Sequence, residues 1–320
     1  MPSSQLDRVK AYAVAAGGDL RLVQGAGGNF SVKTHDVMWI KASGTRLSRA
    51  LDEQIFVPMR LADTRAAVLE TEDLTPYVVQ GESTDGLRPS IETSLHALLP
   101  HRVVLHVHST GAIAAGLGDE PGAALDSLPG WFDTAVVPYA KPGVLLARAV
   151  LAEIGHEPAD APLALLLLNH GLVAAADDVE TAERIVEAVQ QAFAARPEPA
   201  DAGTDAGTDG WEPLHPAGTL TDDEAAVLRL GPFTPDASVF LGAVPFTTRA
   251  DPDPTSLVAT DDDGSVWVRT GTGADEVEIA RSLVDVARLV RGARATPLTP
   301  DQVDELINWE AEKWRRQLKR

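Results

Sequence analysis

The sequence predicts an α/β protein in which helices cover a sheet of mixed or antiparallel strands. Short apolar runs, which are typical of strands, alternate with segments of helical periodicity, and no long parallel strand–helix–strand repeat is present. Turns rich in glycine, asparagine and serine separate the first strands, as in hairpins and meanders. These observations together indicate a layered helix-and-sheet fold.

Periodicity and turn residues divide residues 1–195, which we interpret as one domain, into alternating elements. The clearest amphipathic helix is expected over 178–195, where apolar residues recur at helical spacing. Ser90 can cap a helix that ends at Pro100. The other expected helices cover residues 4–16, 63–70, 111–115 and 142–154. The expected strands fall within 25–33, 37–41, 103–108, 135–139 and 163–168.

A change of composition follows the first domain. Residues 196–212 contain the near-repeat Ala-Gly-Thr-Asp and are expected to form a linker or mobile loop. Residues 213–320 are expected to form a smaller α+β segment of unknown role. It would contain a hairpin over 256–269, a helix over 275–291 and a final helix opened by Thr299 and Pro300.

Bulk composition limits the kinds of partner. The 320 residues carry a formal net charge of -20, which argues against nucleic acid and anionic membranes because both require basic patches. Cysteine is absent, so disulfides and thiolate chemistry are excluded and any metal must take His, Asp or Glu ligands. No apolar run approaches the length of a signal-peptide core or membrane span, so we expect a cytoplasmic protein.

Histidines concentrate at the ends of the two most apolar strands. His106 and His108 are one residue apart on a strand and therefore face the same way. His170 follows the apolar run 163–168. Three imidazoles with one open coordination position are typical of a catalytic zinc. His96 and His101 precede the strand on another element, so we do not expect them to be ligands.

Other polar signals are weaker and allow two interpretations. Glu92 and His96 are four residues apart and share one face of the expected helix. They either form a hydrogen bond on the protein surface or belong to a helix that is directed at the metal. The glycine-rich turn before Asn29 lacks the lysine and spacing of a P-loop, and no long helix follows it. This turn and Ser43-Gly44 either are ordinary hairpin turns or form a cradle for a phosphate or a hydroxyl-rich ligand.

Five ordered motifs resemble the class II aldolase/adducin family over residues 5–195. They are Gly28-Asn29-x-Ser31, Ser43-Gly44, Pro89-Ser90-x-Glu92, His106-x-His108 and Asn169-His170-Gly171. The segment 89–101 looks most like the aldolase domain of bacterial rhamnulose-phosphate aldolase/dehydrogenase fusions. The resemblance implies a three-layer α/β/α fold around a mostly antiparallel sheet and a homo-oligomer, expected to be a tetramer.

The resemblance also assigns roles to residues. It implies His106, His108 and His170 as metal ligands and Glu92 as the acid/base carboxylate. It implies Asn29, Ser43, Gly44 and Ser90 as the residues that hold a substrate phosphate. Two departures are evident: Ile91 stands where small-sugar aldolases often carry a second serine, and no tyrosine matches the protonating tyrosine of fuculose-type aldolases. Tyr139 is the nearest candidate.

The function that follows is a metal-dependent aldolase acting on a small sugar or sugar phosphate. It would cleave a ketose, with a ketose 1-phosphate favoured, through a metal-stabilised enediolate. Zinc is the expected metal, and cobalt and manganese suit the same ligands. The alternatives are an epimerase or dehydratase of the same family, which shares this chemistry, and a non-catalytic adducin-like assembly module.

Overall fold

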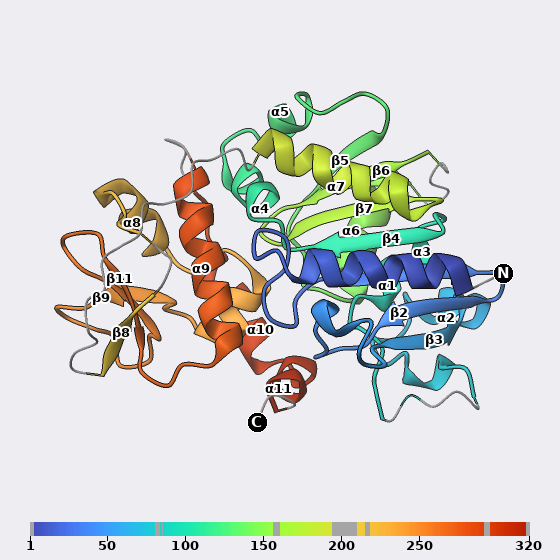
Figure 1. Cartoon of the computed structure of the whole chain (residues 1–320), viewed down its shortest axis with the longest axis horizontal. Helices are drawn as coiled ribbons and strands as arrows, with labels where there is room; N and C mark the ends of the chain where they lie inside the picture. The colour runs from blue at the N-terminus through green and yellow to red at the C-terminus, as the bar shows by residue number, and fades with distance from the viewer. Residues whose placement is uncertain are drawn as a thin grey trace.

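The computed structural model describes residues 3–80, 84, 86–155, 161–193, 210–214, 218–290 and 295–317. Its centre is a seven-stranded sheet in the order β3-β2-β1-β4-β7-β6-β5 (Figure 1). Every neighbouring pair is antiparallel except β5 and β6. The strands are β1 (Asn29–Thr34), β2 (Val37–Lys41), β3 (Phe56–Arg60), β4 (Val103–Val107), β5 (Asp133–Val137), β6 (Leu163–Leu167) and β7 (Gly171–Ala176).

Helices cover both faces of this sheet. One face carries α1 (Ser3–Gly17), α4 (Thr110–Leu117) and α7 (Val179–Phe193), with the short α5 (Pro121–Leu125) beside α4. The opposite face carries α2 (Leu61–Ala67), α3 (Thr93–Leu98) and α6 (Val144–Ile154). Two single 3-10 turns lie in the connections, η1 (Leu47–Arg49) and η2 (Thr75–Tyr77). The predicted three-layer α/β/α class with a mostly antiparallel sheet is confirmed.

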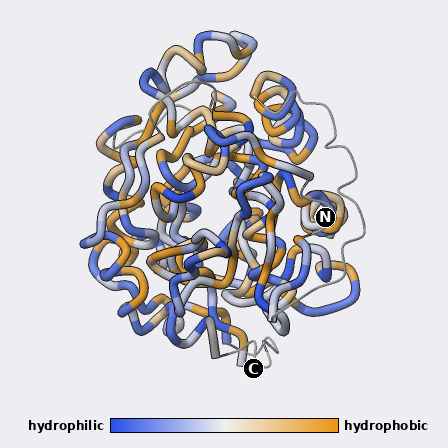
Figure 2. The backbone as a smooth tube through the Cα atoms, turned by 90° about the vertical axis from the view of Figure 1, so that its left-hand side faces the viewer, coloured by the Kyte–Doolittle hydropathy of each residue, from blue (hydrophilic) through white to orange (hydrophobic). Residues whose placement is uncertain are grey.

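Alternation along β4 divides its side chains between these layers. Leu105 and Val107 pack into the core beneath α1, α4 and α7, whereas Val104 packs into the core beneath α3 and α6. His106 therefore lies on the face of Val104, as expected for a strand with a two-residue repeat. Figure 2 shows hydrophobic stretches running through the packed elements and hydrophilic stretches at the periphery of that view.

The C-terminal segment forms a second, smaller sheet in the order β8-β11-β10-β9. The predicted hairpin is β10 and β11. The helix expected to open at Thr299 and Pro300 is present and has a capping box of Thr299 and Gln302, but it is not the final helix, because α11 follows it. The strands are β8 (Trp211–Pro213), β9 (Phe246–Thr248), β10 (Val258–Thr260) and β11 (Val266–Arg269). The helices are α8 (Asp222–Leu228), the π-helical η3 (Ala237–Leu241), α9 (Ala274–Leu289), α10 (Pro300–Asn308) and α11 (Glu310–Gln317).

This segment is packed on the first domain through α9. Ile113 and Leu117 of α4 belong to the same buried cluster as Leu283 of α9 (Figure 1). At the other end of α9, the Glu278 carboxylate accepts a hydrogen bond of 2.7 Å from the backbone N–H of Gly25. The glycine-rich turn before β1 is thus held by the C-terminal segment. None of the described helices is long and apolar enough to cross a membrane.

Several expected boundaries differ from the structure, and two of the differences bear on the site and the domain division. The helix that Ser90 is expected to cap begins only at Thr93, because Pro89 pairs with Ala42 and the N–H of Ser90 donates to the Lys41 carbonyl. The segment before α3 therefore extends the sheet edge instead of starting a helix. Most of the expected linker over 196–212 lies outside the described residues. Its C-terminal boundary lies earlier in the sequence than expected. Buried Trp211 already belongs to β8.

The turn between β6 and β7 brings His170 to the end of β4. Asn169 adopts the left-handed conformation at φ 56°, and Gly171 lies directly against the β4 backbone. A Cβ atom added to Gly171 would stand 2.3 Å from the carbonyl oxygen of Val107. Only glycine allows this approach without moving the two strands apart.

We expect Gly171→Ala to destabilise the protein by roughly 1–3 kcal/mol, the usual cost of overpacking. The measurement is the free energy of unfolding from urea titration followed by circular dichroism. Gly122→Ala is the matched control, since a Cβ at this exposed helical position meets nothing within 4 Å. Equal stability of the two variants would contradict the close approach.

Candidate metal centre

Three imidazoles gather at the C-terminal end of β4. His106 lies in β4, His108 follows it directly, and His170 lies in the turn before β7. One potential ligand atom from each lies within 4.8 Å of the others, and all three residues are buried. The ring centroids are 4.8 to 5.3 Å apart. The structure thus brings together the three histidines that the sequence analysis selected.

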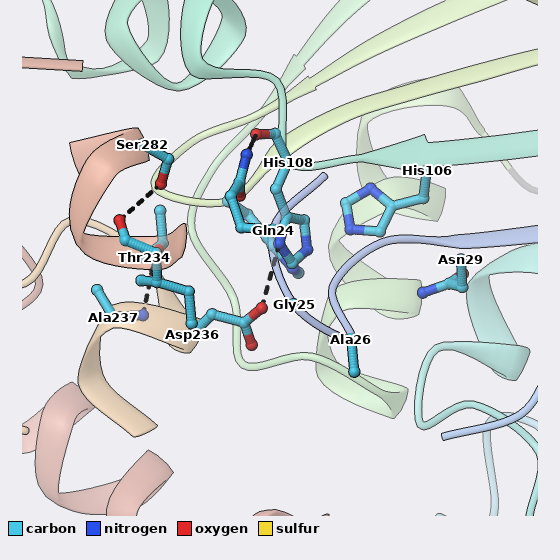
Figure 3. A network of polar contacts seen from close by, with 12 residues as sticks. Gln24, Gly25, Ala26, Asn29, His106, His108, Thr234, Asp236, Ala237 and Ser282 are labelled. Carbon is cyan, nitrogen blue, oxygen red and sulfur yellow. Dashed lines mark hydrogen bonds and ion pairs between the residues drawn. The ribbon is translucent and has the colours of Figure 1, made fainter. Parts of the chain in front are cut away.

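The hydrogen bonds of the rings leave nitrogen atoms directed at a common centre. His106 Nδ1 lies 3.0 Å from the Leu172 carbonyl oxygen, to which it can only donate, so its Nε2 carries the lone pair. This buried Nε2 has no hydrogen-bond partner. His108 Nδ1 lies 3.2 Å from an Asp236 carboxylate oxygen, which leaves its Nε2 free to coordinate (Figure 3). An orphaned buried nitrogen among three imidazoles fits a divalent cation.

Glu92 completes the inner group. Its Oε2 lies 3.5 Å from His106 Nε2 and its Oε1 lies 3.5 Å from His170 Nε2. Asn29 Nδ2 donates to Oε2 at 2.5 Å. The position of Asn29 follows from sheet register, because it pairs with His106 across β1 and β4. Glu92 itself is the residue immediately before α3.

Burial sets the protonation of this group. Desolvation lowers the pKa of His106 and lowers that of His170 to about 3, so both imidazoles are neutral near pH 7. Burial alone would raise the pKa of Glu92, but the three histidines and the Asn29 amide outweigh it and leave the pKa at about 2. An ionised carboxylate beside neutral imidazoles is the state that a metal ion requires.

A small cavity opens beside the histidines. Its lining includes Glu92, His108 and His170 together with all four residues that were expected to hold a phosphate: Asn29, Ser43, Gly44 and Ser90. Ile91 also contributes to the wall. Residues from three separate segments therefore line one space, which is the arrangement that an anion pocket would need.

Neither His96 nor His101 reaches the centre. His96 Nδ1 lies 2.8 Å from the Ser31 hydroxyl, and His101 Nε2 lies 2.7 Å from the Ala161 carbonyl. His96 is fully buried, so the surface alternative for the Glu92–His96 pair is wrong and the ring instead pins β1 to α3. Tyr139 packs against the C-terminal core and is not among the residues lining the cavity.

The C-terminal segment supplies residues that the sequence analysis did not select. Asp236, Glu312 and Arg315 line the cavity opposite the first domain's residues. Burial alone would raise the pKa of Asp236, yet Arg315 and His108 hold it well below its usual range. Desolvation and the nearby Asp236 raise the pKa of Glu312 despite Arg315. No spacing in the sequence marks these residues, since one lies before η3 and two lie on α11.

The buried imidazoles give the metal-free protein a pH-dependent stability. Below its ordinary pKa of 6.5 an unfolded histidine gains a proton, whereas folded His170 gains one only near pH 3. Unfolding therefore takes up protons, and stability falls as the pH is lowered. We expect His170 alone to account for about 2 kcal/mol between pH 6.5 and 5.

Urea unfolding of chelator-treated protein at several pH values measures this slope. His170→Gln should flatten it, and His35→Asn should not, because His35 is exposed. An unchanged slope in the His170 variant would argue against a neutral buried imidazole.

The first domain is similar to class II aldolase domains of known proteins. The family model for the class II aldolase and adducin N-terminal domain matches residues 9–196. The N-terminal class II aldolase domain of a conserved protein from Thermoplasma acidophilum shares 29% identity at a TM-score of 0.50, covering 59% of this chain and 92% of that one. An L-fuculose 1-phosphate aldolase shares 25% identity at a TM-score of 0.39, covering 57% and 82%.

A curated protein is also similar to part of this chain. The uncharacterized oxidoreductase YuxG of Bacillus subtilis is 29% identical over 195 residues, which are 55% of this chain and 27% of that protein. The chain thus spans about a quarter of the length of that relative. The family model covers more than half of the chain and includes His106, His108 and His170 of the candidate metal centre, Glu92 and the first-domain turns of the cavity. The chain belongs to the class II aldolase and adducin N-terminal domain family.

Proposed function

We propose that this protein is a metal-dependent aldolase that cleaves a ketose, with a ketose 1-phosphate as the favoured substrate. The observation that carries the proposal is the convergence of three buried imidazoles and the Glu92 carboxylate beside a cavity that polar residues also line. Family membership supports a lyase of the class II aldolase type. A non-catalytic assembly module would have no need for this buried set.

Each part of the site has a proposed role. His106, His108 and His170 would hold the divalent cation, with zinc preferred and cobalt or manganese as alternatives. When bound, the cation would supply Lewis-acid stabilisation of the negative charge that develops on the substrate oxygens. Glu92 would accept a proton and return it to the carbon from which the aldehyde has departed.

The anion end of the substrate needs local donors because the chain's net charge of -20 repels a phosphate. Ser43 and Ser90 would donate hydroxyl hydrogen bonds, and the backbone at Gly44 would add an N–H group. Asn29 contributes less freely, because its amide N–H already bonds to Glu92. Ile91 is an apolar neighbour in this wall and weakens the pocket for phosphate.

The activity is tested by loading the protein with zinc, cobalt or manganese and measuring aldehyde release from matched ketoses and ketose 1-phosphates. We expect metal-dependent cleavage, and a preference for the phosphorylated member of a pair. Ser43→Ala should raise KM for the phosphorylated substrate about tenfold, the worth of one hydrogen bond to a charged group, and leave the free ketose unaffected. Ser127→Ala is the control, since Ser127 is exposed and distant from the cavity.

The result also separates the alternatives. Equal activity on the ketose and its 1-phosphate would show that the site does not recognise the phosphate group, but it would leave the metal assignment intact. Formation of an isomeric sugar without aldehyde would indicate an epimerase, and loss of water would indicate a dehydratase. Absence of any metal-dependent turnover across the panel would contradict the proposed function.

Glu92→Gln should lower turnover by about two to four orders of magnitude, the usual share of general acid–base catalysis. The amide keeps the size of the carboxylate, so the bound metal, measured by elemental analysis, should change little. Glu153→Gln on the exposed face of α6 is the matched control. Wild-type turnover in the Glu92 variant would move the acid/base role to another group.

A further inference from the structure

A chain of three buried ionic contacts connects α11 to His108. Glu312 lies 3.2 Å from Arg315, Arg315 lies 2.7 Å from Asp236, and Asp236 lies 3.2 Å from His108 Nδ1. The exposed fractions of Glu312, Asp236 and Arg315 are only 1%, 5% and 9%. Desolvating three charges is costly unless they pair with one another. Because Asp236 also contacts His108 and all three residues line the cavity, these ionic contacts bear on the site as well as on one another.

Asp236 is directed at His108 by its local structure. Its backbone angles are helical just before η3 (φ -63°, ψ -38°), and its carboxylate accepts no capping hydrogen bond. Thr234 caps this turn instead, because its hydroxyl accepts from the N–H of Ala237 (Figure 3). The Asp236 carboxylate is thereby released to face His108 and Arg315.

The first domain is shaped to receive this carboxylate. A Cβ atom added to Gly27 would lie 2.8 Å from His108 Nδ1 and 3.1 Å from Asp236 Oδ2. The glycine-rich turn thus passes beside the His108–Asp236 contact, where any side chain would intrude. On the neighbouring turn, Asn169 Nδ2 donates to the carbonyls of Phe233 and Thr296 at 3.1 and 2.9 Å. The C-terminal segment therefore contacts the surroundings of both His108 and His170.

We propose that the C-terminal segment completes the metal centre, with Asp236 as the positioning residue of His108 and Arg315 as the clamp that holds Asp236. Asp236 accepts the Nδ1–H of His108, which fixes the tautomer and aims Nε2 at the centre. A carboxylate in this place also makes the imidazole a stronger ligand. Arg315 holds the carboxylate in place through its 2.7 Å contact, and Glu312 orients the guanidinium in turn. This inference rests on the proposed metal centre.

The experiment is a cobalt titration of the full chain, with competition by a chromophoric chelator. We expect Asp236→Ala to weaken cobalt binding by about 10- to 100-fold, the usual effect of removing such a partner. The visible absorption bands of the bound cobalt should also shift, because the orientation of His108 changes. Arg315 keeps Glu312 as a partner in this variant, so no buried charge is left alone. Asp236→Asn retains an acceptor oxygen and should restore part of the affinity.

Two controls separate positioning from general destabilisation. Asp261→Asn removes a charge from another aspartate of the same segment, one that pairs with Arg249. Val284→Ala opens a cavity in the α9 core and lowers stability without touching the site. Both should bind cobalt as the wild type does and show its spectrum.

The outcomes distinguish this inference from the function on which it rests. If His106→Asn abolishes cobalt binding but Asp236→Ala changes neither the affinity nor the spectrum, the proposed role of Asp236 is wrong and the metal centre stands. A wild-type chain that binds no cobalt would overturn both. If Val284→Ala weakens cobalt binding as much as Asp236→Ala does, the contact between Asp236 and His108 contributes only to the stability of the fold.

Discussion

Desolvation of ionisable groups is the constraint on which the rest of this structure depends. Around the end of β4, three imidazoles, two ion-paired acids, an arginine and Glu92 are all withdrawn from water. None of them could be buried alone without a cost of several kcal/mol. His106 and His170 meet this cost by remaining neutral, and Asn29 donates a hydrogen bond to the Glu92 carboxylate. A divalent cation would bring further compensation to the same place.

This constraint explains why glycines line the site. Gly171 permits contact between the His170 turn and β4, and Gly27 permits contact between His108 and Asp236. A side chain at either position would separate groups that must remain within a few ångströms of one another. The motifs around Asn29 and His170 are therefore as much about close backbone approach as about the polar side chains they carry.

The candidate site is built from both the first domain and the C-terminal segment. The family match ends at residue 196, but the cavity wall continues into residues 235, 236, 312 and 315. The α4–α9 contact and the Glu278–Gly25 hydrogen bond fix this segment on the first domain. The small size of the cavity and the charge on its far wall are consequently set by a part of the chain that the family pattern does not describe.

Much of the site was predictable from the sequence because its geometry is local. A two-residue repeat places His106 and Val104 on one face of a strand wherever the strand lies, and ordered motifs identify Glu92, Ser43 and Ser90. The capping box at Thr299 and the hairpin over 256–269 are equally local. The start of α3 was misplaced because pairing of Pro89 with Ala42, a long-range contact, overrides the capping signal of Ser90.

Only the tertiary structure determines what faces His108. Asp236 lies 128 positions away along the chain and Arg315 lies 79 further on, and neither belongs to a motif or to a periodic pattern. Their burial depends on how α9 docks on α4 and how α11 returns over the cavity. The sequence by itself thus determined the layers, the three imidazoles and Glu92, because strand alternation and short motifs act over a few residues. The counter-charges were decided by packing between distant segments, which no local pattern encodes.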